Sequence, residues 1–302
     1  MGADGPRQPK LMSMTRKLLF EAPDALQYFA ALVADDATLP LLEAAAAVAQ
    51  SADPGADVQA VLAEVDALAA TFVRRLPADA GALQRLRLLN RYFFGELGFA
   101  GNVNDYYDPR NSYLPDVLAR RRGIPISLAM VYLELAAQAG LKACGVSFPG
   151  HFLVKLRLPQ GEAVIDPFNG QSLSREQLEE RLAPVRRHQG LVGDDEVPLG
   201  LFLQAASPRD ILARMLRNLK EIHRTAGDWR ALLAVQERLV VLLPDQAAER
   251  RDRGLAQAEL GRLDRACEDI ETYLQRTRGA PDAAEMRRRL RRWRAVPPPA
   301  MH

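Results

Sequence analysis

The sequence is poor in the residues from which metal sites, disulfide frameworks and membrane spans are built. It has 2 cysteines and 4 histidines among 302 residues, and no apolar run approaches the roughly 18 residues that cross a membrane. Cys144 and Cys267 lie far apart, which argues against a disulfide framework and favours a reducing compartment. No histidine has a metal-ligand spacing, and no glycine-rich phosphate loop follows a strand. We therefore expect a cytoplasmic protein with no cofactor and no metal.

Net charge is also small. The chain carries 40 Lys and Arg against 38 Asp and Glu, a formal net charge of +2, so no overall field attracts nucleic acid or a membrane. Residues 1–10 lack the apolar segment of a signal peptide, and their glycine, proline and charge predict disorder. A hydrophobic content of 48% suffices for a packed core, and the length allows two domains or one domain with an appendage.

The first third of the chain has the periodicity of helices. Apolar residues recur there at spacings of three and four, which places them on one face of each helix. The clearest stripes are Leu62, Val65, Leu68 and Phe72, and then Leu83, Leu86, Leu88, Leu89 and Phe93. This pattern predicts an N-terminal helical subdomain over residues 11–98.

Residues 98–116 lack the helical periodicity of the preceding part and form a long segment rich in Asn, Asp and Tyr. Loops of this length in a compact domain are often functional. The alternative is an ordered structural loop whose rings pack and whose Asn and Asp side chains form turns. If the segment is functional, its candidate binding residues are Asn104, Asp105, Tyr106, Tyr107, Asn111 and Tyr113.

The middle of the chain predicts a helix followed by a small antiparallel sheet. Pro125 suits the first turn of a helix over residues 124–139, because a proline there needs no N–H partner, and Gly140 ends the helix. Three strands, the last two forming a hairpin, and a short helix follow at residues 143–147, 151–158, 163–165 and 174–182.

From Pro208 onward the chain is helical and contains a repeat. Gly227-Asp228-Trp229 recurs as Gly261-Arg262-Leu263, a spacing of 34 residues, which is the period of tetratricopeptide helix pairs. A last helix, over residues 282–294, places Met286, Leu290 and Trp293 on one face, as a capping helix would. The expected division of the chain is therefore 1–10, 11–98, 99–183, a polar linker over 184–207, 208–296 and a tail over 297–302.

The opposite face of that last helix is almost entirely arginine. A solvated outer face is the favoured interpretation, because an apolar stripe interleaves with the charges. Binding of an acidic peptide or of nucleic acid is the alternative. The residues concerned are Arg287, Arg288, Arg289, Arg291, Arg292 and Arg294.

Several motifs together resemble a known family. They are Arg122-Gly123-Ile124-Pro125-Ile126-Ser127-Leu128, Phe148-Pro149-Gly150-His151-Phe152-Leu153 and Ile165-Asp166-Pro167-Phe168, with the Tyr-rich segment before them. With the tetratricopeptide pattern behind them, they resemble the bacterial SirB-type proteins, in which such a region follows a transglutaminase-like core. The resemblance implies an α+β fold with a papain/transglutaminase-like core, a helix on an antiparallel sheet. An N-terminal helical part and a C-terminal all-α TPR-like region would flank that core.

In the wider transglutaminase-like superfamily a Gly-x-Cys motif opens the central helix. By this resemblance Gly123 matches the glycine and Pro125 stands at the cysteine position, while His151 and Asp166 match the superfamily histidine and Asp-Pro. In an active member the helix N-terminus lowers the thiol pKa, the histidine shares the proton and the aspartate orients the histidine. Proline has no nucleophilic atom, so His151 and Asp166 are interpreted as vestigial catalytic residues.

Two residues nearby are weak candidates for a relocated nucleophile. Ser127 lies two residues past the cysteine position, roughly 200° around the helix, which favours a first-turn hydrogen bonder. Cys144 alternates with Val146 on one strand face, which is typical of a buried small hydrophobe. His151 beside a glycine is equally interpretable as a structural hydrogen bonder, and we expect it to contact Asp166 in either case.

The leading hypothesis is a non-catalytic, transglutaminase-like regulatory module that binds a protein or peptide through the Tyr-rich segment and His151. The alternative is a divergent hydrolase or acyltransferase that uses Ser127 or Cys144 with His151 and Asp166. A third hypothesis is an adaptor in which only the helical repeats bind. Neither a membrane nor nucleic acid is favoured as a partner, and the sequence does not define the oligomeric state.

Overall fold

The computed structural model describes residues 23–189 and 197–295. The predicted disorder over residues 1–10 and the tail over 297–302 lie outside these ranges. Within the described residues, none of the helices combines the length and apolar character that crossing a bilayer requires.

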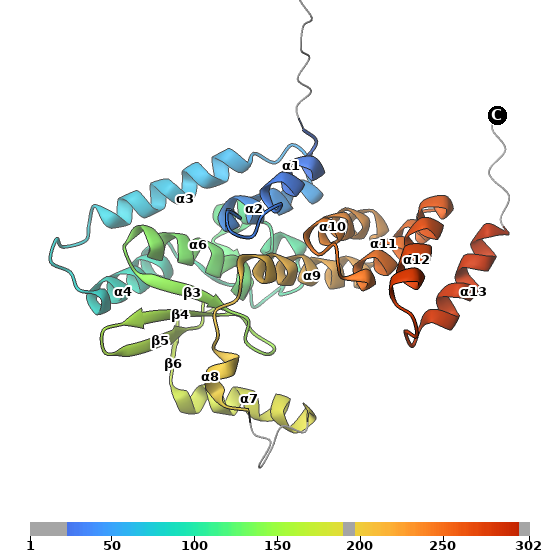
Figure 1. Cartoon of the computed structure of the whole chain (residues 1–302). Coiled ribbons are helices and arrows are strands. Elements are labelled where there is room, and N and C mark those ends of the chain that lie inside the picture. Colours follow the sequence, from blue (N-terminus) through green and yellow to red (C-terminus); the bar gives the residue numbers. More distant parts are fainter. Residues whose placement is uncertain (1–22, 190–196, 296–302) are drawn as a thin grey trace, which may run out of the picture.

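A four-stranded antiparallel sheet forms the middle layer of the core, with helices on both of its faces (Figure 1). Its strand order is β3-β4-β5-β6, with bounds Lys142–Val146, Leu153–Leu158, Gly161–Ile165 and Ser172–Leu173. The α+β fold with a helix on an antiparallel sheet is therefore confirmed. The short strand β6 was not predicted, because two residues give no readable periodicity.

Alternation along β4 assigns the two faces of the sheet. Phe152, Val154 and Leu156 pack into the cluster that contains α6 (Pro125–Gln138), whereas Leu153 packs against the helices on the other side. The predicted strand over 151–158 began too early. Gly150 has a φ of +70°, which is incompatible with extended backbone. His151 therefore lies in the bend before β4.

Helix α6 begins at Pro125, as predicted, and Ile124 is its N-cap residue. Every residue from Pro125 to Tyr132 is buried, so the first half of the helix is covered on all sides. The reason is position, because α6 lies between the sheet and the long helix α3 (Val58–Val73), so both of its sides are covered (Figure 1). A helix that is apolar all round belongs in a core.

The predicted N-terminal helical part is present. It comprises α1 (Ala25–Leu32), α2 (Leu41–Ala47), η1 (Val48–Ser51), α3 and α4 (Ala82–Asn90), followed by one π-helical turn, η2 (Arg91–Glu96). The π turn was not predicted. It places Phe93 in a stack on Phe99, with ring centres 4.4 Å apart, while Phe94 packs near Tyr132 at 5.9 Å.

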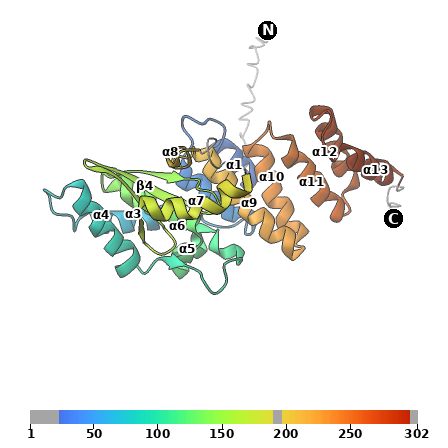
Figure 2. The same ribbon diagram turned by 90° about the horizontal axis from the view of Figure 1, so that it is seen from below.

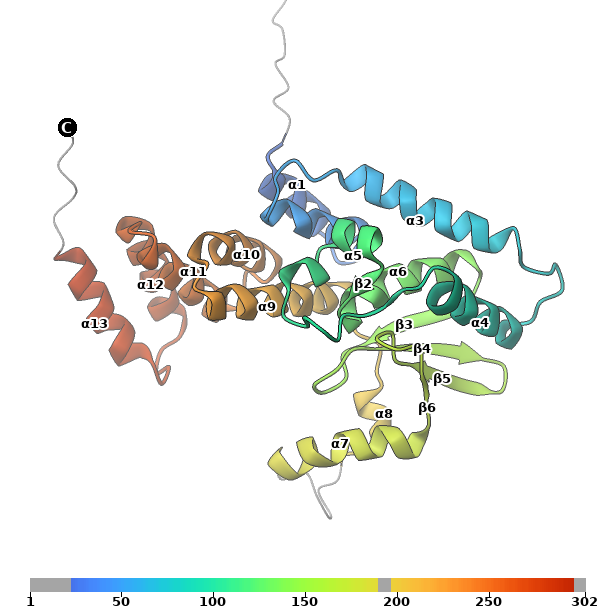
Figure 3. The ribbon, with the colours of Figure 1, turned by 180° about the vertical axis from the view of Figure 1, so that it is seen from behind.

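The Tyr-rich segment is an ordered structure that joins the core to the helical repeats. It contains β1 (Ala100–Gly101), η3 (Pro109–Asn111) and then α5 (Leu114–Arg120), and β1 pairs in parallel with β2 (Arg122–Gly123). Figure 3 shows this segment lying between α6 and α9 (Pro208–Ala226).

The helix predicted over 174–182 was too short. Helix α7 runs from Arg175 to Gln189 and passes through Pro184, which the sequence analysis took as the start of a polar linker. The proline removes one helical N–H, but Arg186 fixes the later turns by donating to Glu179 at 2.6 Å and to the Val197 carbonyl at 2.7 Å.

The segment that follows is not a polar linker where it is described. Helix α8 (Leu199–Phe202) and the residue after it bury Leu199 and Leu203 against α7 and the sheet. A short apolar helix therefore covers part of the sheet between the core and the repeats.

The C-terminal part consists of stacked helix pairs, as predicted. Its helices are α9, α10 (Trp229–Leu242), α11 (Ala247–Glu259), α12 (Leu263–Arg276) and α13 (Ala283–Arg294), and Figure 2 shows them in a row leading away from the core. Gly227 and Gly261 occupy equivalent turns, with φ of 69° and 75°. Close approach of a neighbour does not explain these glycines, because a Cβ at either position would meet nothing within 4 Å. The positive φ is what requires glycine.

One hydrophobic cluster joins the N-terminal helices, the sheet and the first helix pair of the C-terminal part. It runs from Phe29 in α1 through α6 to Ile211 in α9 and Leu243 after α10. The N-terminal helices, the sheet and the first helix pair therefore share a single core, although the sequence analysis divided them at residues 98 and 208.

Candidate functional site

The histidine and aspartate that the sequence analysis singled out are in contact. His151 precedes β4 and Asp166 follows β5, and the pairing of Val154 with Ile165 brings these two strand ends together. His151 Nε2 lies 2.8 Å from Asp166 Oδ1. The contact expected from the sequence is confirmed, while a catalytic or binding role for it remains a proposal.

Asp166 is also held by two groups that the sequence analysis missed. The Phe168 N–H donates to Oδ1 at 3.0 Å, and Arg181 Nη1 on α7 donates to Oδ2 at 3.0 Å. Burial favours the neutral acid, but the hydrogen bonds from His151, Phe168 and Arg181 outweigh it and hold the pKa of Asp166 below its ordinary value. The carboxylate is therefore ionised at neutral pH and fixed on both oxygens.

The turn that carries Asp166 is clamped by close packing. A Cβ on Gly101 would lie 2.1 Å from the ring of Phe168, and a Cβ on Gly170 would lie 2.8 Å from the ring of Phe94. The Gly101 N–H also donates to the Phe168 carbonyl at 2.7 Å. Strand β1 and the π turn thus position the aspartate from both sides.

The helix end at the nucleophile position presents no reactive side chain. Pro125 is the first residue of α6 and is buried. Ser127 Oγ donates into a pair of carbonyl oxygens, 2.5 Å from Asn111 and 3.0 Å from Ile124, and accepts from the Ile124 N–H at 3.2 Å. The expectation that Ser127 is a first-turn hydrogen bonder is confirmed, and its hydroxyl is fully buried.

Cys144 is half-buried rather than fully buried as expected. It lies on the edge strand β3 opposite Lys155, in the interior of the β3–β4 pairing, whereas His151 lies beyond the end of that pairing. Burial raises the pKa of its thiol, and the charge of Lys155 only partly opposes this. The thiol is therefore not activated in the way a catalytic cysteine requires.

The six candidate binding residues of the Tyr-rich segment divide into two groups. Four are exposed, and they are Asn104, Asp105, Tyr106 and Tyr107. The other two, Asn111 and Tyr113, are buried, so the expectation that they form a binding surface is wrong. The Asn111 amide donates to the Asp105 carbonyl at 2.7 Å and so shapes the loop from within.

Tyr113 joins the segment to the repeats through a buried contact. Its hydroxyl lies 3.3 Å from Nε2 of His223 on α9, and both residues are almost completely buried. Burial lowers the pKa of His223 below its ordinary value of 6.5, with the charge of Asp228 opposing, so the folded protein holds this histidine neutral.

We expect acid to destabilise the protein through His223. Because its pKa is depressed by folding, the unfolded chain binds the proton more readily, so stability is complete above pH 6.5 and falls below it. The slope is at most about 1.4 kcal/mol per pH unit. Urea denaturation between pH 5 and 8 should show this slope in the wild type and in the His188→Gln control, an exposed histidine. An equal slope in His223→Gln would contradict the assignment.

The exposed tyrosines border a cavity beside the nucleophile position. It has a volume of about 600 Å³ and is lined by Tyr106, Tyr107 and Ile124 from the core and by Asn218 and Ile222 from α9, among others. Neither His151 nor Asp166 is in this lining. Among the described residues, no group of three or more His, Cys, Asp or Glu side chains is arranged to hold a metal ion.

Comparisons with known proteins agree with this architecture. Residues 59–217 match the model of the transglutaminase-like superfamily, and residues 219–291 match a tetratricopeptide repeat model. A UPF0162 protein of Xylella fastidiosa (strain Temecula1) is 40% identical over 246 residues, covering 80% of this chain and 85% of the relative. The UPF0162 protein PA3419 of Pseudomonas aeruginosa is 34% identical over 233 residues, covering 77% and 81%. The chain therefore belongs to the transglutaminase-like superfamily and, within it, to the UPF0162 proteins.

A more distant relative comes from an animal. F-box only protein 21 of Mus musculus is 31% identical over 166 residues, which cover 54% of this chain and 26% of that protein. No solved structure matches the chain.

Proposed function

We propose that this protein is a non-catalytic, transglutaminase-like regulatory module that binds a protein or peptide partner in the cytoplasm. The observation that carries the proposal is the buried proline at the N-terminus of α6, where the superfamily pattern has its cysteine. A proline cannot form a covalent acyl intermediate. The regulatory role rests on the SirB-type resemblance, and the reducing compartment on two free cysteines.

The surroundings of His151 support binding over turnover. Asp166 orients the imidazole through Nε2, as in a catalytic pair. Catalysis would also need a hydroxyl or thiol at the other ring nitrogen. Within the described part of the chain, the hydrogen bonds of Ser127 go to backbone groups of its own helix start and of Asn111. Arg181 forms an ion pair with the second oxygen of the Asp166 carboxylate. A carboxylate fixed on both oxygens is suited to a rigid wall of a recognition site.

A covalent probe tests the absence of catalysis. We expect an activated acyl ester to label neither Ser127 nor Cys144 in a manner that depends on His151. Intact-mass and peptide mass spectrometry of the wild type and of His151→Ala measure this, with His188→Ala as a control for loss of an exposed histidine. Labelling that disappears in His151→Ala but persists in His188→Ala would establish the alternative, a hydrolase or acyltransferase with a relocated nucleophile.

A further inference from the structure

Arg214 on α9 has no carboxylate partner within the described residues. Its Nη1 donates to Ser147 Oγ at 2.8 Å and to the Phe148 carbonyl at 3.0 Å. The guanidinium carbon lies 5.7 Å from the centre of the Phe152 ring. Burial lowers the pKa of Arg214, and its neighbour Tyr106 opposes this. A partly desolvated guanidinium that bonds only neutral groups is a favourable place for an anion, since its planar fork matches a carboxylate.

Two cavities along α9 share one lining residue, Asn218. The first, of about 540 Å³, is lined by Arg214, Asn218 and Ser147 together with residues of and after α8. The second is the 600 Å³ cavity beside Tyr106 and Tyr107, and Asn218 lines it too. Residues 214, 218 and 222 follow one another at helical spacing on one side of α9. The two cavities are called the α9 groove below.

The acidic residues of the α9 groove are already engaged. The Ser207 hydroxyl donates to the carboxylate of Asp210 at 2.7 Å, and Arg224 donates to that of Glu221 at 2.6 Å. Arg217, which lines the first cavity, is paired with Glu249 at 3.0 Å. Arg217 and Glu221 thus have oppositely charged partners and Asp210 is held by a hydroxyl, whereas the cation Arg214 has no carboxylate partner among the described residues.

The apolar end of the groove is suited to a bulky side chain. Tyr106 and Tyr107 are 42% and 76% exposed, and Ile222 and Ile124 also line the second cavity. Exposed tyrosines beside an apolar hollow are typical of the centre of a protein interface. The Asn218 amide between the two cavities offers both a donor and an acceptor to a peptide backbone.

The distance between Arg214 and Ile222 along α9 determines how far apart the two contacting side chains of a ligand must be. Ile222 lies eight positions after Arg214, which is about 12 Å along a helix. An extended chain covers about 3.3 Å per residue, so this distance corresponds to three or four residues. We infer that the α9 groove binds an extended segment of a partner protein, with an Asp or Glu side chain on Arg214 and a bulky apolar side chain three or four residues away in the second cavity. This inference rests on the proposed function.

An array of blocked decapeptides tests the inference. Each peptide places one Glu and one Leu in a Gly-Ser background, in both orders and at separations from one to seven residues. Binding of the full chain should peak at separations of three or four. Fluorescence anisotropy of the best peptide should show at least tenfold weaker binding when its Glu is replaced by Gln, a comparison that leaves the protein unchanged.

Protein variants locate the contact. Arg214→Gln should weaken binding at least tenfold and remove the preference for Glu over Gln, whereas Arg287→Gln, an equal charge change on an exposed arginine of α13, should not. Thermal unfolding of each variant controls for loss of the bonds to residues 147 and 148. No separation optimum, or an unchanged preference in folded Arg214→Gln, overturns the inference. Self-association of the free chain that Arg214→Gln abolishes also overturns it, because the occupant is then a second copy.

A further experiment distinguishes failure of the groove inference from failure of the proposed function. A photo-crosslinker at Tyr107 identifies a partner, which is then purified and titrated against the wild type and Arg214→Gln. A partner that binds both equally retains the proposed function and refutes the groove. Acyl transfer in the covalent test refutes the proposed function, whatever the array shows.

Discussion

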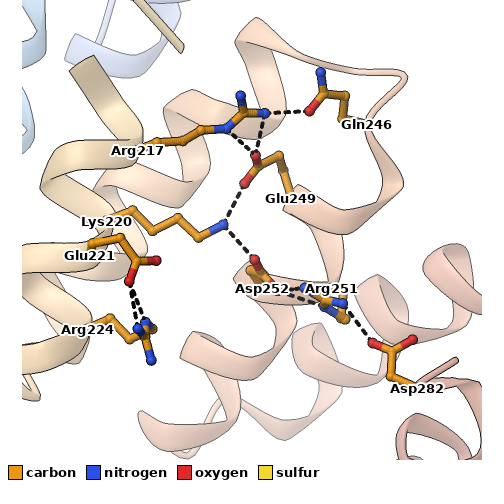
Figure 4. A network of polar contacts seen from close by, with 9 residues as sticks. All are labelled: Arg217, Lys220, Glu221, Arg224, Gln246, Glu249, Arg251, Asp252 and Asp282. Atoms are coloured by element: carbon orange, nitrogen blue, oxygen red, sulfur yellow. Dashed lines mark hydrogen bonds and ion pairs between the residues drawn. The ribbon is translucent and has the colours of Figure 1, made fainter. Parts of the chain in front are cut away.

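Replacing Glu249 by alanine is expected to lower the free energy of unfolding by about 2–3 kcal/mol. Its buried carboxylate on α11 accepts from Lys220 at 2.8 Å and from Arg217 at 3.0–3.1 Å, both on α9 (Figure 4). The change leaves the largely buried Lys220 ammonium with Asp252 alone. Arg217 is half exposed and contributes less, because water screens its charge.

Glu221→Ala is the matched control for this change. Glu221 lies on α9, the helix of Lys220 and Arg217, but it pairs separately with Arg224, and these two side chains are 59% and 58% exposed (Figure 4). Its loss should change stability by less than about 0.5 kcal/mol. Urea denaturation measures both variants. Equal effects at the two sites would show that burial does not determine the strength of these ion pairs.

A second large effect is expected from Gly101→Ala. The added Cβ would overlap the Phe168 ring, which is part of the turn that holds Asp166. The backbone φ of Gly101 is not positive, so the cost is steric, about 2–3 kcal/mol for overpacking of a core. NMR shift changes should centre on residues 166–171, because the ring must move with that turn.

Gly95→Ala provides the comparison. A Cβ at residue 95 meets nothing within 4 Å, and its φ is also not positive, so the variant should be neutral or slightly more stable. Urea denaturation and the same NMR spectra apply to it. A neutral Gly101→Ala variant would mean that Phe168 swings aside freely, and the turn would then not be clamped.

The sequence predicted the parts of the fold that depend on local patterns. Pro125 at the start of α6, the hairpin that pairs Val154 with Ile165, and the glycine turns at 227 and 261 each have a local cause in backbone geometry. The end of α7 was missed because Pro184 reads as a helix breaker. What holds the helix beyond it is the tertiary contact of Arg186 with the Val197 carbonyl, which no local pattern encodes.

The candidate site was predicted only where local sequence motifs determine it. The contact of His151 with Asp166 follows from two motifs at adjoining strand ends. Arg181 was missed. Leu178 and Leu182 form an apolar stripe on the same helix, and Arg181 lies next to that stripe, so its position facing the core could have been predicted. The burial of Asn111 and Tyr113 had no such signal, because α9, distant in the sequence, covers Tyr113.

The single core that runs from Phe29 to Leu243 constrains how the protein is made. Its inner surface cannot close until residue 243 has been synthesised, when about four-fifths of the chain exists. At ordinary translation rates of about 5–20 residues per second, apolar helices stay uncovered for on the order of tens of seconds. The early helices therefore expose apolar surface, which favours aggregation, until α9 and α10 cover them.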